Sequence, residues 1–359
     1  MKIGILTFHH SRNYGAVLQA YGLIQVLIAQ GHIVETIDYR NQAISERSSF
    51  IKTNNPLIAL LKFINGFWSH YKKIIMFNRF EKKYLNRSSH IFSPSDIEKS
   101  DYDCIIIGSD QVWSPIITDG PDKVYWGNYK PKGAFILSYA ASSCDINKFD
   151  VSLFENISSW VSNFSAISVR EQRLKTFIES KTNVEVSVVC DPTILAGRDV
   201  FDKITSSRVI RFPYVFLYSV ENDENLLLLA RKVAKEYNAT LVTLGESTIS
   251  SRIKNYNDGI VRINASVSQM LSLIKYAECV VALSFHGTAL SLLFEKDFYS
   301  VRGKNMARVE DLLKPCHLMG RIIDTNSIIK INHIDYTYPL TSVEQIRNKS
   351  KKWLIKRIK

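Results

Sequence analysis

The sequence predicts an α/β protein built from two parallel-sheet units. Short apolar runs rich in Val and Ile alternate with amphipathic segments of helix length, which is typical of parallel strands covered by helices. The alternation continues through both halves of the 359 residues, a length that suits two domains. Hydrophobic residues make up 46% of the chain, so two cores can be buried.

The expected strands fall into two comparable groups. Those of the first half are Ile3–Phe8, Ile33–Tyr39, Cys104–Gly108, Phe135–Ala141, Ala166–Arg170 and Val186–Cys190. Those of the second half are Tyr214–Val220, Thr240–Leu244, Ile260–Ile263, Val280–Leu283, Phe298–Val301 and Arg321–Ile323. The main helices are expected at Gly15–Gln30, Pro56–Lys82, Ser152–Phe164, Glu224–Tyr237, Val267–Ala277, Thr288–Glu295 and Ser342–Ile358.

A polar stretch near Gly197–Phe212 marks the expected boundary between the units. We therefore expect an N-terminal lobe of residues 1–200, a C-terminal lobe of residues 201–335 and a basic C-terminal helix of residues 336–359. A basic helical insertion is expected near residues 45–95 of the first lobe. The last helix has no strand after it, and it is expected to pack back onto the first lobe.

The charge of the chain favours anionic partners. Its 46 Lys and Arg residues outnumber its 34 Asp and Glu residues, for a net charge of +12. The excess is concentrated in Lys62–Lys83 and Lys349–Lys359, which indicates surface patches rather than a nucleic-acid groove. The basic tail also carries Trp353, so two alternatives stay open: contact with an anionic membrane face, or a solvated helix packed across the lobes.

Cysteine spacing and hydropathy point to the cytoplasm. The five cysteines form neither a CxxC pair nor a Cys/His metal-ligand spacing, so a reducing compartment and no structural zinc are expected. The N-terminus lacks the apolar region of a signal peptide, and no stretch of 18 apolar residues is free of charge.

Polar residues follow the first and third expected strands. In open parallel sheets the ligand crevice lies outside the carboxyl ends of the strands. Asn13, Tyr14 and Gly15 open a helix after the first strand, where backbone amides attract an anion; a plain turn is the alternative. After the third strand, Ser109 precedes Asp110, a candidate base or sugar-hydroxyl partner, or else the cap of the next helix.

Two further side chains of the first half lie at strand ends. Trp113 offers an indole that can stack on a sugar ring. Arg170 directly follows an apolar run, and its guanidinium can hold a carboxylate or phosphate in fork geometry. A surface ion pair between Arg170 and Glu171 is the alternative interpretation.

The sharpest local signal is a histidine at the end of a buried strand in the second half. The strand stops at Ser284, and Phe285, His286, Gly287 and Thr288 begin a helix. An imidazole there lies beside backbone donors that favour an anion, and it suits proton transfer near neutral pH. The other histidines lack this setting and are expected to be surface or core residues. In the loop after the next strand, Arg302, Lys304 and Arg308 add positive charge.

Seven segments together resemble the polysaccharide pyruvyl transferase family. They run in the family's order from residue 2 to about residue 323, whereas G-x-G-x-x-G and Walker phosphate-loop motifs are absent. The matching segments are Gly4–Thr7, Asn13–Tyr21, Gly108–Trp113, Tyr139–Ser142, Ser168–Glu171, Asp191–Thr193 and Ser284–Thr288.

The resemblance implies two Rossmann-like lobes in the GT-B style, with the ligand cleft between them. It implies transfer of pyruvate from phosphoenolpyruvate, as donor substrate and without a cofactor, to a sugar as a ketal. The product would be a capsule or exopolysaccharide precursor, with a lipid-linked oligosaccharide as the expected acceptor. Family members commonly carry an arginine just ahead of the histidine, where this chain has Phe285.

This chemistry assigns a role to each candidate. Ketal formation needs a proton for the methylene carbon, a cationic pocket and help in deprotonating two hydroxyls. We expect His286 to be the acid, Arg170 and Arg308 to hold the anion, and Asp110 to orient or deprotonate a hydroxyl. Two alternatives remain: a GT-B glycosyltransferase that uses a nucleotide sugar, and a non-catalytic member of a polysaccharide system.

Overall fold

The computed structural model describes residues 1–47, 71–143, 146, 151–219, 223–245, 259–303 and 306–359. The contacts divide the chain into two compact units. Unit 1 comprises the described residues of Met1–Ala59, Asn78–Ala196 and Ile346–Lys359. Unit 2 comprises the described residues of Leu60–Phe77 and Gly197–Gln345.

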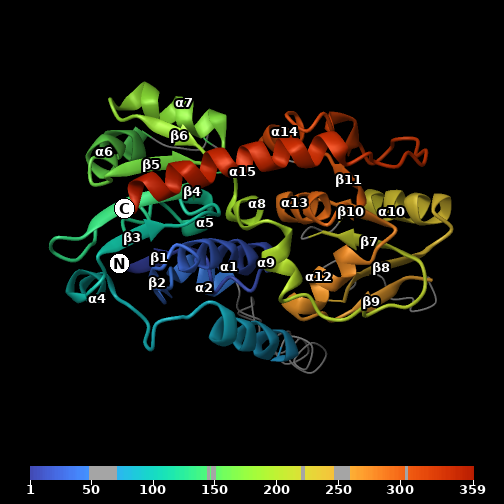
Figure 1. The fold of residues 1–359 in the computed structure, drawn as a ribbon, viewed down its shortest axis with the longest axis horizontal. Helices are drawn as coiled ribbons and strands as arrows, with labels where there is room; N and C mark the ends of the chain where they lie inside the picture. The colour runs from blue at the N-terminus through green and yellow to red at the C-terminus, as the bar shows by residue number, and fades with distance from the viewer. Residues whose placement is uncertain (48–70, 144–145, 147–150, 220–222, 246–258, 304–305) are drawn as a thin grey trace, which may run out of the picture. The chain divides into compact units, whose positions relative to one another are not determined.

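Unit 1 is built on a six-stranded parallel sheet with the order β2-β1-β3-β4-β5-β6 (Figure 1). Register pairs Ile3 with Val34 on one side and with Cys104 on the other. The direction of strand order changes at β1, so the edge between β1 and β3 is a topological switch point. The strands are β1 Lys2–Leu6, β2 Ile33–Thr36, β3 Cys104–Ile107, β4 Phe135–Ala141, β5 Ala166–Val169 and β6 Val186–Val188.

Unit 2 contains a second six-stranded parallel sheet, with the order β12-β11-β10-β7-β8-β9. Numbered within the unit, this order is the 3-2-1-4-5-6 order of the Rossmann fold, with its switch point between β7 and β10. The strands are β7 Tyr214–Tyr218, β8 Thr240–Leu244, β9 Val261–Ile263, β10 Cys279–Ala282, β11 Asp297–Val301 and β12 Ile322–Ile323. The expected fold class of two Rossmann-like lobes is confirmed.

Helices accompany both sheets. Those of unit 1 are α1 Tyr14–Ile28, α2 Gln42–Arg47, α4 Pro94–Lys99, α5 Pro115–Thr118, α6 Val151–Val161, α7 Gln172–Lys181 and α8 Pro192–Ala196. Those of unit 2 are α9 Arg198–Asp202, α10 Glu224–Glu236, α12 Val267–Lys275, α13 Phe285–Leu293 and α14 Ala307–Leu313. The last helix, α15, spans Thr337–Arg357.

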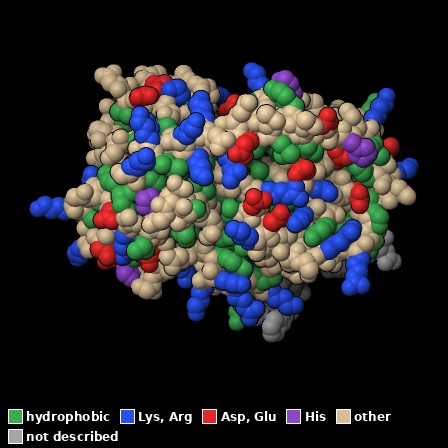
Figure 2. Space-filling view, in the orientation of Figure 1, with side chains coloured by type: hydrophobic (Ala, Val, Ile, Leu, Met, Phe, Trp, Pro, Cys, Tyr) green, Lys and Arg blue, Asp and Glu red, His purple; other side chains and the backbone are tan. Residues whose placement is uncertain are grey.

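The basic insertion is described only in part. Residues 71–84 are helical, and the remainder of the helix expected at Pro56–Lys82 lies outside the described residues. Lys72, Arg79, Lys82 and Lys83 on this helix are exposed. Figure 2 shows Lys and Arg side chains gathered over it, as expected for a surface patch.

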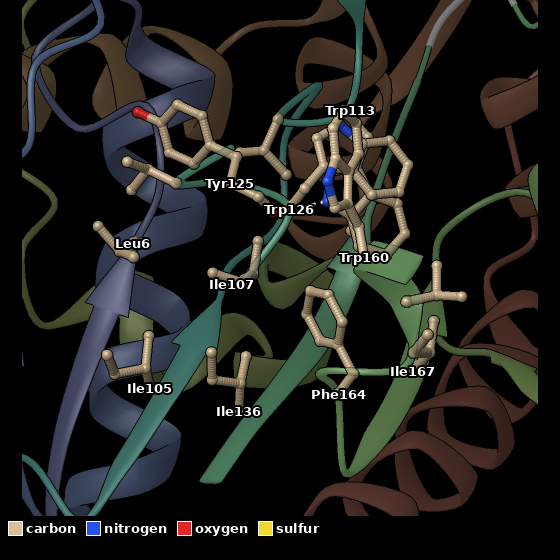
Figure 3. Packing of buried hydrophobic residues seen from close by; sticks show 14 of the residues in the cluster. Leu6, Ile105, Ile107, Trp113, Tyr125, Trp126, Ile136, Trp160, Phe164 and Ile167 are labelled. Atoms are coloured by element: carbon tan, nitrogen blue, oxygen red, sulfur yellow. Dashed lines mark hydrogen bonds between the residues drawn. The ribbon is translucent and has the colours of Figure 1, made fainter. Parts of the chain in front are cut away.

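The core of unit 1 continues past the carboxyl ends of its strands into an aromatic cluster (Figure 3). The rings of Trp113 and Trp126 stack with centroids 4.6 Å apart, and Trp160 lies 5.8 Å from Trp126. Apolar strand residues such as Ile107 and Ile136 support these rings from below. Aromatic burial on this scale holds the loops at the sheet edge in place.

The C-terminal half of α15 packs onto unit 1, as expected for the last helix. Arg347 donates hydrogen bonds to the carbonyls of Leu195 and Ala196, at 2.9 and 3.0 Å. The apolar side chains of Leu354 and Ile358 are 0% and 2% exposed, so they are not available for insertion into a membrane. No helix in the described part of the chain is long and apolar enough to cross a membrane.

Candidate active site

The carboxyl edge of the second sheet carries His286 in the first turn of α13. Ser284 is extended and caps this helix, and its hydroxyl accepts a hydrogen bond from the Gly287 amide at 3.1 Å. The helix therefore begins directly beyond β10, next to the switch point between β7 and β10. His286 is 8% exposed, and the positive end of the helix dipole lies beside it.

Gly287 allows the start of α13 to lie against the end of β7. A Cβ atom at this position would meet Tyr218 Cδ1 at 2.6 Å and the Ala282 Cβ at 3.0 Å. Any larger residue would force the Tyr218 ring or the helix start to shift. Thr288 is 0% exposed, and its hydroxyl lies 2.5 Å from the Ser300 hydroxyl on β11. Gly287 and Thr288, expected to contact substrate, are buried supports of the helix.

Arg308 brings a cation close to Phe285. It lies in the first turn of α14, and its guanidinium is 6.0 Å from the centre of the Phe285 ring. The same ring meets His286 edge-on, with centroids 5.3 Å apart. Phe285 is therefore flanked by an imidazole and a guanidinium. Arg302 is instead an exposed side chain 3.4 Å from Glu310, and Lys304 lies outside the described residues.

The carboxyl edge of the first sheet contains the other predicted residues. Asn13 caps α1, and its side-chain oxygen accepts from the amides of Gly15 and Ala16 at 2.9 and 3.4 Å. These amides, which were expected to attract an anion, are therefore occupied by the cap. Tyr14 is 9% exposed in the first turn of the same helix.

Trp113 is a core residue and not a sugar-stacking platform. It is 1% exposed, its ring is covered by Trp126, and its indole nitrogen donates to the Tyr125 carbonyl at 2.7 Å. A sugar ring cannot reach a face that another indole already covers. The expected stacking role of Trp113 is wrong.

Asp110 adopts an unusual backbone conformation at the end of β3. Its φ of 79° lies in the left-handed region, and its carboxylate accepts from the Gln111 amide at 2.9 Å. Strain of this kind clusters at functional sites. The N-cap of α5 is Ser114, so Asp110 is not the cap of the next helix. Asp110 is half-buried at the sheet edge and stays a candidate for contact with a hydroxyl.

Arg170 is buried among carboxylates. Its guanidinium donates to Asp191 at 2.6 Å and to the Ser142 hydroxyl at 2.9 Å, and its Nε lies 3.7 Å from Glu171. Burial disfavours its charge, but Asp191 and Glu171 outweigh that effect and raise the Arg170 pKa. The Ser109 hydroxyl also donates to Asp191, at 3.1 Å. Arg170 is therefore neither a guanidinium open to a substrate anion nor one half of a surface ion pair with Glu171.

A buried histidine network that was not among the expected site residues lies after β1. His9 is 0% exposed, with Nε2 3.0 Å from an Asp38 oxygen and Nδ1 3.2 Å from the Thr7 carbonyl. Arg40 donates twice to Asp38, at 2.8 and 2.9 Å. Burial favours protonated Asp38, but the hydrogen bonds from His9 and Arg40 hold its pKa below the usual range. The signal was available, because His9 follows β1 much as His286 follows β10.

Metal and thiol chemistry find no support among the described residues. Within them, no three His, Cys, Asp or Glu side chains group as metal ligands. The cysteines at positions 104, 190, 279 and 316 are free and buried. Burial raises the pKa of Cys190 to about 12, and a thiol that stays protonated is a poor nucleophile.

Solved structures with a similar fold include two UDP-GlcNAc 2-epimerases. The Methanocaldococcus jannaschii protein, in complex with UDP-GlcNAc and UDP, has a TM-score of 0.52 and 11% identity, covering 100% of this chain and 99% of its own. The Rickettsia bellii protein has a TM-score of 0.51 and 11% identity, covering 99% of this chain and 95% of its own. At such identities the likeness establishes only the shared GT-B fold.

Comparison at the sequence level is more specific. No curated protein sequence matches the chain. The profile of the polysaccharide pyruvyl transferase family matches residues 13–305, which include Asp110, Arg170 and the His286 helix start. Because this match covers most of the sequence, the chain belongs to the polysaccharide pyruvyl transferase family.

Proposed function

We propose that the protein transfers pyruvate from phosphoenolpyruvate to two hydroxyls of one sugar in a polysaccharide precursor, forming a ketal. The observation that carries this proposal is His286 in the first turn of α13 at the switch point of the second sheet, with Arg308 beside it across Phe285. A proton donor beside a cation and a helix dipole suits an enol phosphate. Family membership supports the same reaction.

The proposed reaction balances without a redox partner. His286 gives a proton to the methylene carbon of phosphoenolpyruvate, and the oxygen of one sugar hydroxyl bonds to the adjacent carbon. The carbon–oxygen bond to phosphate then breaks, and the oxygen of the second hydroxyl bonds to the same carbon. Of the two hydroxyl protons, one restores His286 and the other leaves with inorganic phosphate.

Arg308 supplies a positive charge near His286, which the uncharged Phe285 just before it in the sequence cannot supply. Phe285 stands where family members commonly carry an arginine, and the Arg308 guanidinium lies over its ring. A cation on an aromatic face is stabilised by about 0.5–2 kcal/mol. In the proposed site Arg308 binds the carboxylate or phosphate of the donor.

A coupled assay tests the proposal. Purified protein, phosphoenolpyruvate and a panel of lipid-linked and nucleotide-linked sugars are followed for inorganic phosphate and for acceptor mass. Phosphate release that requires an acceptor, together with the mass gain of one ketal-linked pyruvate, is the expected result. His286→Asn should abolish turnover, whereas His90→Asn, at an exposed position, should not.

The competing activity is nucleotide-sugar transfer in the same fold. The Methanocaldococcus jannaschii neighbour is in complex with UDP-GlcNAc and UDP. Thermal protection by UDP but not by phosphoenolpyruvate, with no pyruvylated product from the panel, would replace the proposed function with that one. Protection by neither ligand would favour a non-catalytic member of the system.

A further inference from the structure

His10 is a partly buried residue whose two ring nitrogens are themselves buried. In the described part of the chain neither of these nitrogens has a hydrogen-bond partner. His10 follows β1, and its ring lies 5.2 Å from that of His9. A buried polar group left unsatisfied costs about 1–3 kcal/mol, so this position is costly unless a ligand or solvent satisfies the ring.

The charged side chains around His10 already contact one another. His9 and Arg40 both contact Asp38, and Arg87 bridges Asp38 at 3.3 Å and Glu81 at 3.0 Å. Burial, followed by the nearby His9 and Arg40, lowers the pKa of His10 to about 3. The ring is therefore neutral at physiological pH, with one donor and one acceptor nitrogen.

Other uncharged polar groups at the carboxyl edge of the first sheet are also buried without a hydrogen-bond partner among the described residues. Tyr125 packs edge-on against Phe8, the residue before His9, with ring centroids 5.2 Å apart. Its hydroxyl, like the side-chain oxygens of Gln111 and Ser143, is buried and has no hydrogen-bond partner among the described residues. Figure 3 shows the Tyr125 hydroxyl directed away from the tryptophans, beyond the carboxyl end of β1.

The unsatisfied groups identify the class of ligand. They are a neutral imidazole, a phenol, an amide oxygen and a hydroxyl, and they follow β1, β3 and β4 at the carboxyl edge that contains the switch point. The guanidinium groups of Arg40, Arg87 and Arg170 instead contact carboxylates. An uncharged ligand rich in hydroxyls matches this pattern, whereas a phosphate or carboxylate would leave the neutral groups poorly used.

We propose that the carboxyl edge of β1 and β3 binds the uncharged hydroxyls of the acceptor sugar, with His10 as a hydrogen-bonding partner of one hydroxyl. That this sugar is the acceptor rests on the proposed function, but the binding of a neutral sugar at this edge does not. His9, which is held by Asp38, packs edge-on against the His10 ring and acts as a positioning residue.

Binding is tested on the whole chain with ring nitrogens of histidine labelled for NMR. The probes are methyl glycosides of glucose, galactose, mannose and N-acetylmannosamine, compared with inorganic phosphate and phosphoenolpyruvate. His10→Gln assigns the His10 signals. We expect at least one glycoside to shift these signals and the two anions to leave them in place. Shifts caused by the anions alone would overturn the proposal.

Kinetics supply a second test, with His10→Phe as the disruptive variant and His90→Phe as its control. Loss of one neutral hydrogen bond should raise the acceptor KM up to about ten-fold, with kcat and the phosphoenolpyruvate KM unchanged. An unchanged acceptor KM in His10→Phe overturns the inference while the proposed function stands. Glycoside-induced shifts at His10 without any pyruvyl transfer refute the proposed function and leave this site intact.

Discussion

Replacing Arg170 tests whether its guanidinium supports the fold or holds the donor. Arg170→Met keeps a long apolar side chain but leaves Asp191, whose side chain is 0% exposed, as a buried carboxylate without its 2.6 Å partner. Breaking a buried ion pair on one side costs about 3–5 kcal/mol. For a unit of this size, a loss of about 3 kcal/mol lowers the Tm by roughly 6–12 °C.

The second variant, Asp191→Asn, separates the two roles. It leaves the guanidinium charged and retains one oxygen, which can still accept from the Thr193 amide in the place of Oδ1. The Oδ2 that accepts from Arg170 and from the Ser109 hydroxyl becomes an amide nitrogen. A supporting role predicts that each single variant is destabilised. It also predicts that the double variant, Arg170→Met with Asp191→Asn, loses about 0.5–3 kcal/mol less stability than the two single variants lose in total.

Thermal melting and urea denaturation give the stabilities, and the phosphate assay gives the phosphoenolpyruvate KM. An Arg170→Met protein that melts with the wild type while its phosphoenolpyruvate KM rises ten-fold or more would refute the reasoning. Arg170 would then be a donor-binding residue despite its burial.

Four further outcomes follow from other contacts in the structure. Burial and nearby cations lower the His10 pKa from 6.5 to about 3. Below pH 6.5 the unfolded chain therefore binds a proton at His10 that the folded chain does not bind, and the free energy of unfolding falls as the pH drops from 6.5 towards 3. The loss at pH 5 relative to pH 8 is at most about 2 kcal/mol, and His10→Gln should remove it in urea denaturation at the two pH values; an unchanged pH dependence would contradict this. Gly287→Ala places a Cβ 2.6 Å from Tyr218 Cδ1, so we expect a loss of about 1–3 kcal/mol and lower kcat in melting and phosphate assays, and a wild-type result in both would show that the helix start adapts freely. Leu354→Ala removes a fully buried side chain of α15 and should cost about 2–5 kcal/mol by thermal melting, whereas exposed Lys352→Glu should leave the Tm unchanged. If α15 contacts a membrane, Lys352→Glu should also weaken flotation with anionic liposomes. Equal flotation of the wild-type and Lys352→Glu proteins would argue against a membrane contact at this position.

The sheets could be predicted because a buried parallel strand is a local feature. Each apolar run expected to be a strand pairs in one of the two sheets. The errors lie at the ends, as where Ile33–Tyr39 was expected and β2 stops at Thr36. The sequence pattern does not show where ladder pairing stops. Short helices such as α8 and α14, of 5 and 7 residues, were missed because they hold too few turns for a periodic signal.

Individual site residues were harder to predict than the edges that carry them. The position of His286 just after a buried strand marks it as a candidate in the sequence, and His9 follows β1 in a similar way. The partner of a side chain is not a local property. Asp191 lies 21 residues beyond Arg170, and Asp38 lies 29 residues beyond His9. Parallel sheets bring such residues together only when the chain returns through a helix.

The sequence by itself determined the two parallel α/β units, the family and the strand ends at which chemistry is expected. Apolar periodicity and strand-to-helix transitions are local, and they depend on short-range backbone geometry. Only the tertiary structure decided which polar side chains are satisfied. Trp113 is covered by Trp126, Arg170 is neutralised by Asp191, and His10 keeps buried ring nitrogens without a partner among the described residues. Burial and pairing depend on residues that are distant in the chain. Residues that all follow a strand in the sequence can therefore differ in role: one is a core ring, another a buried ion pair and a third a binding group.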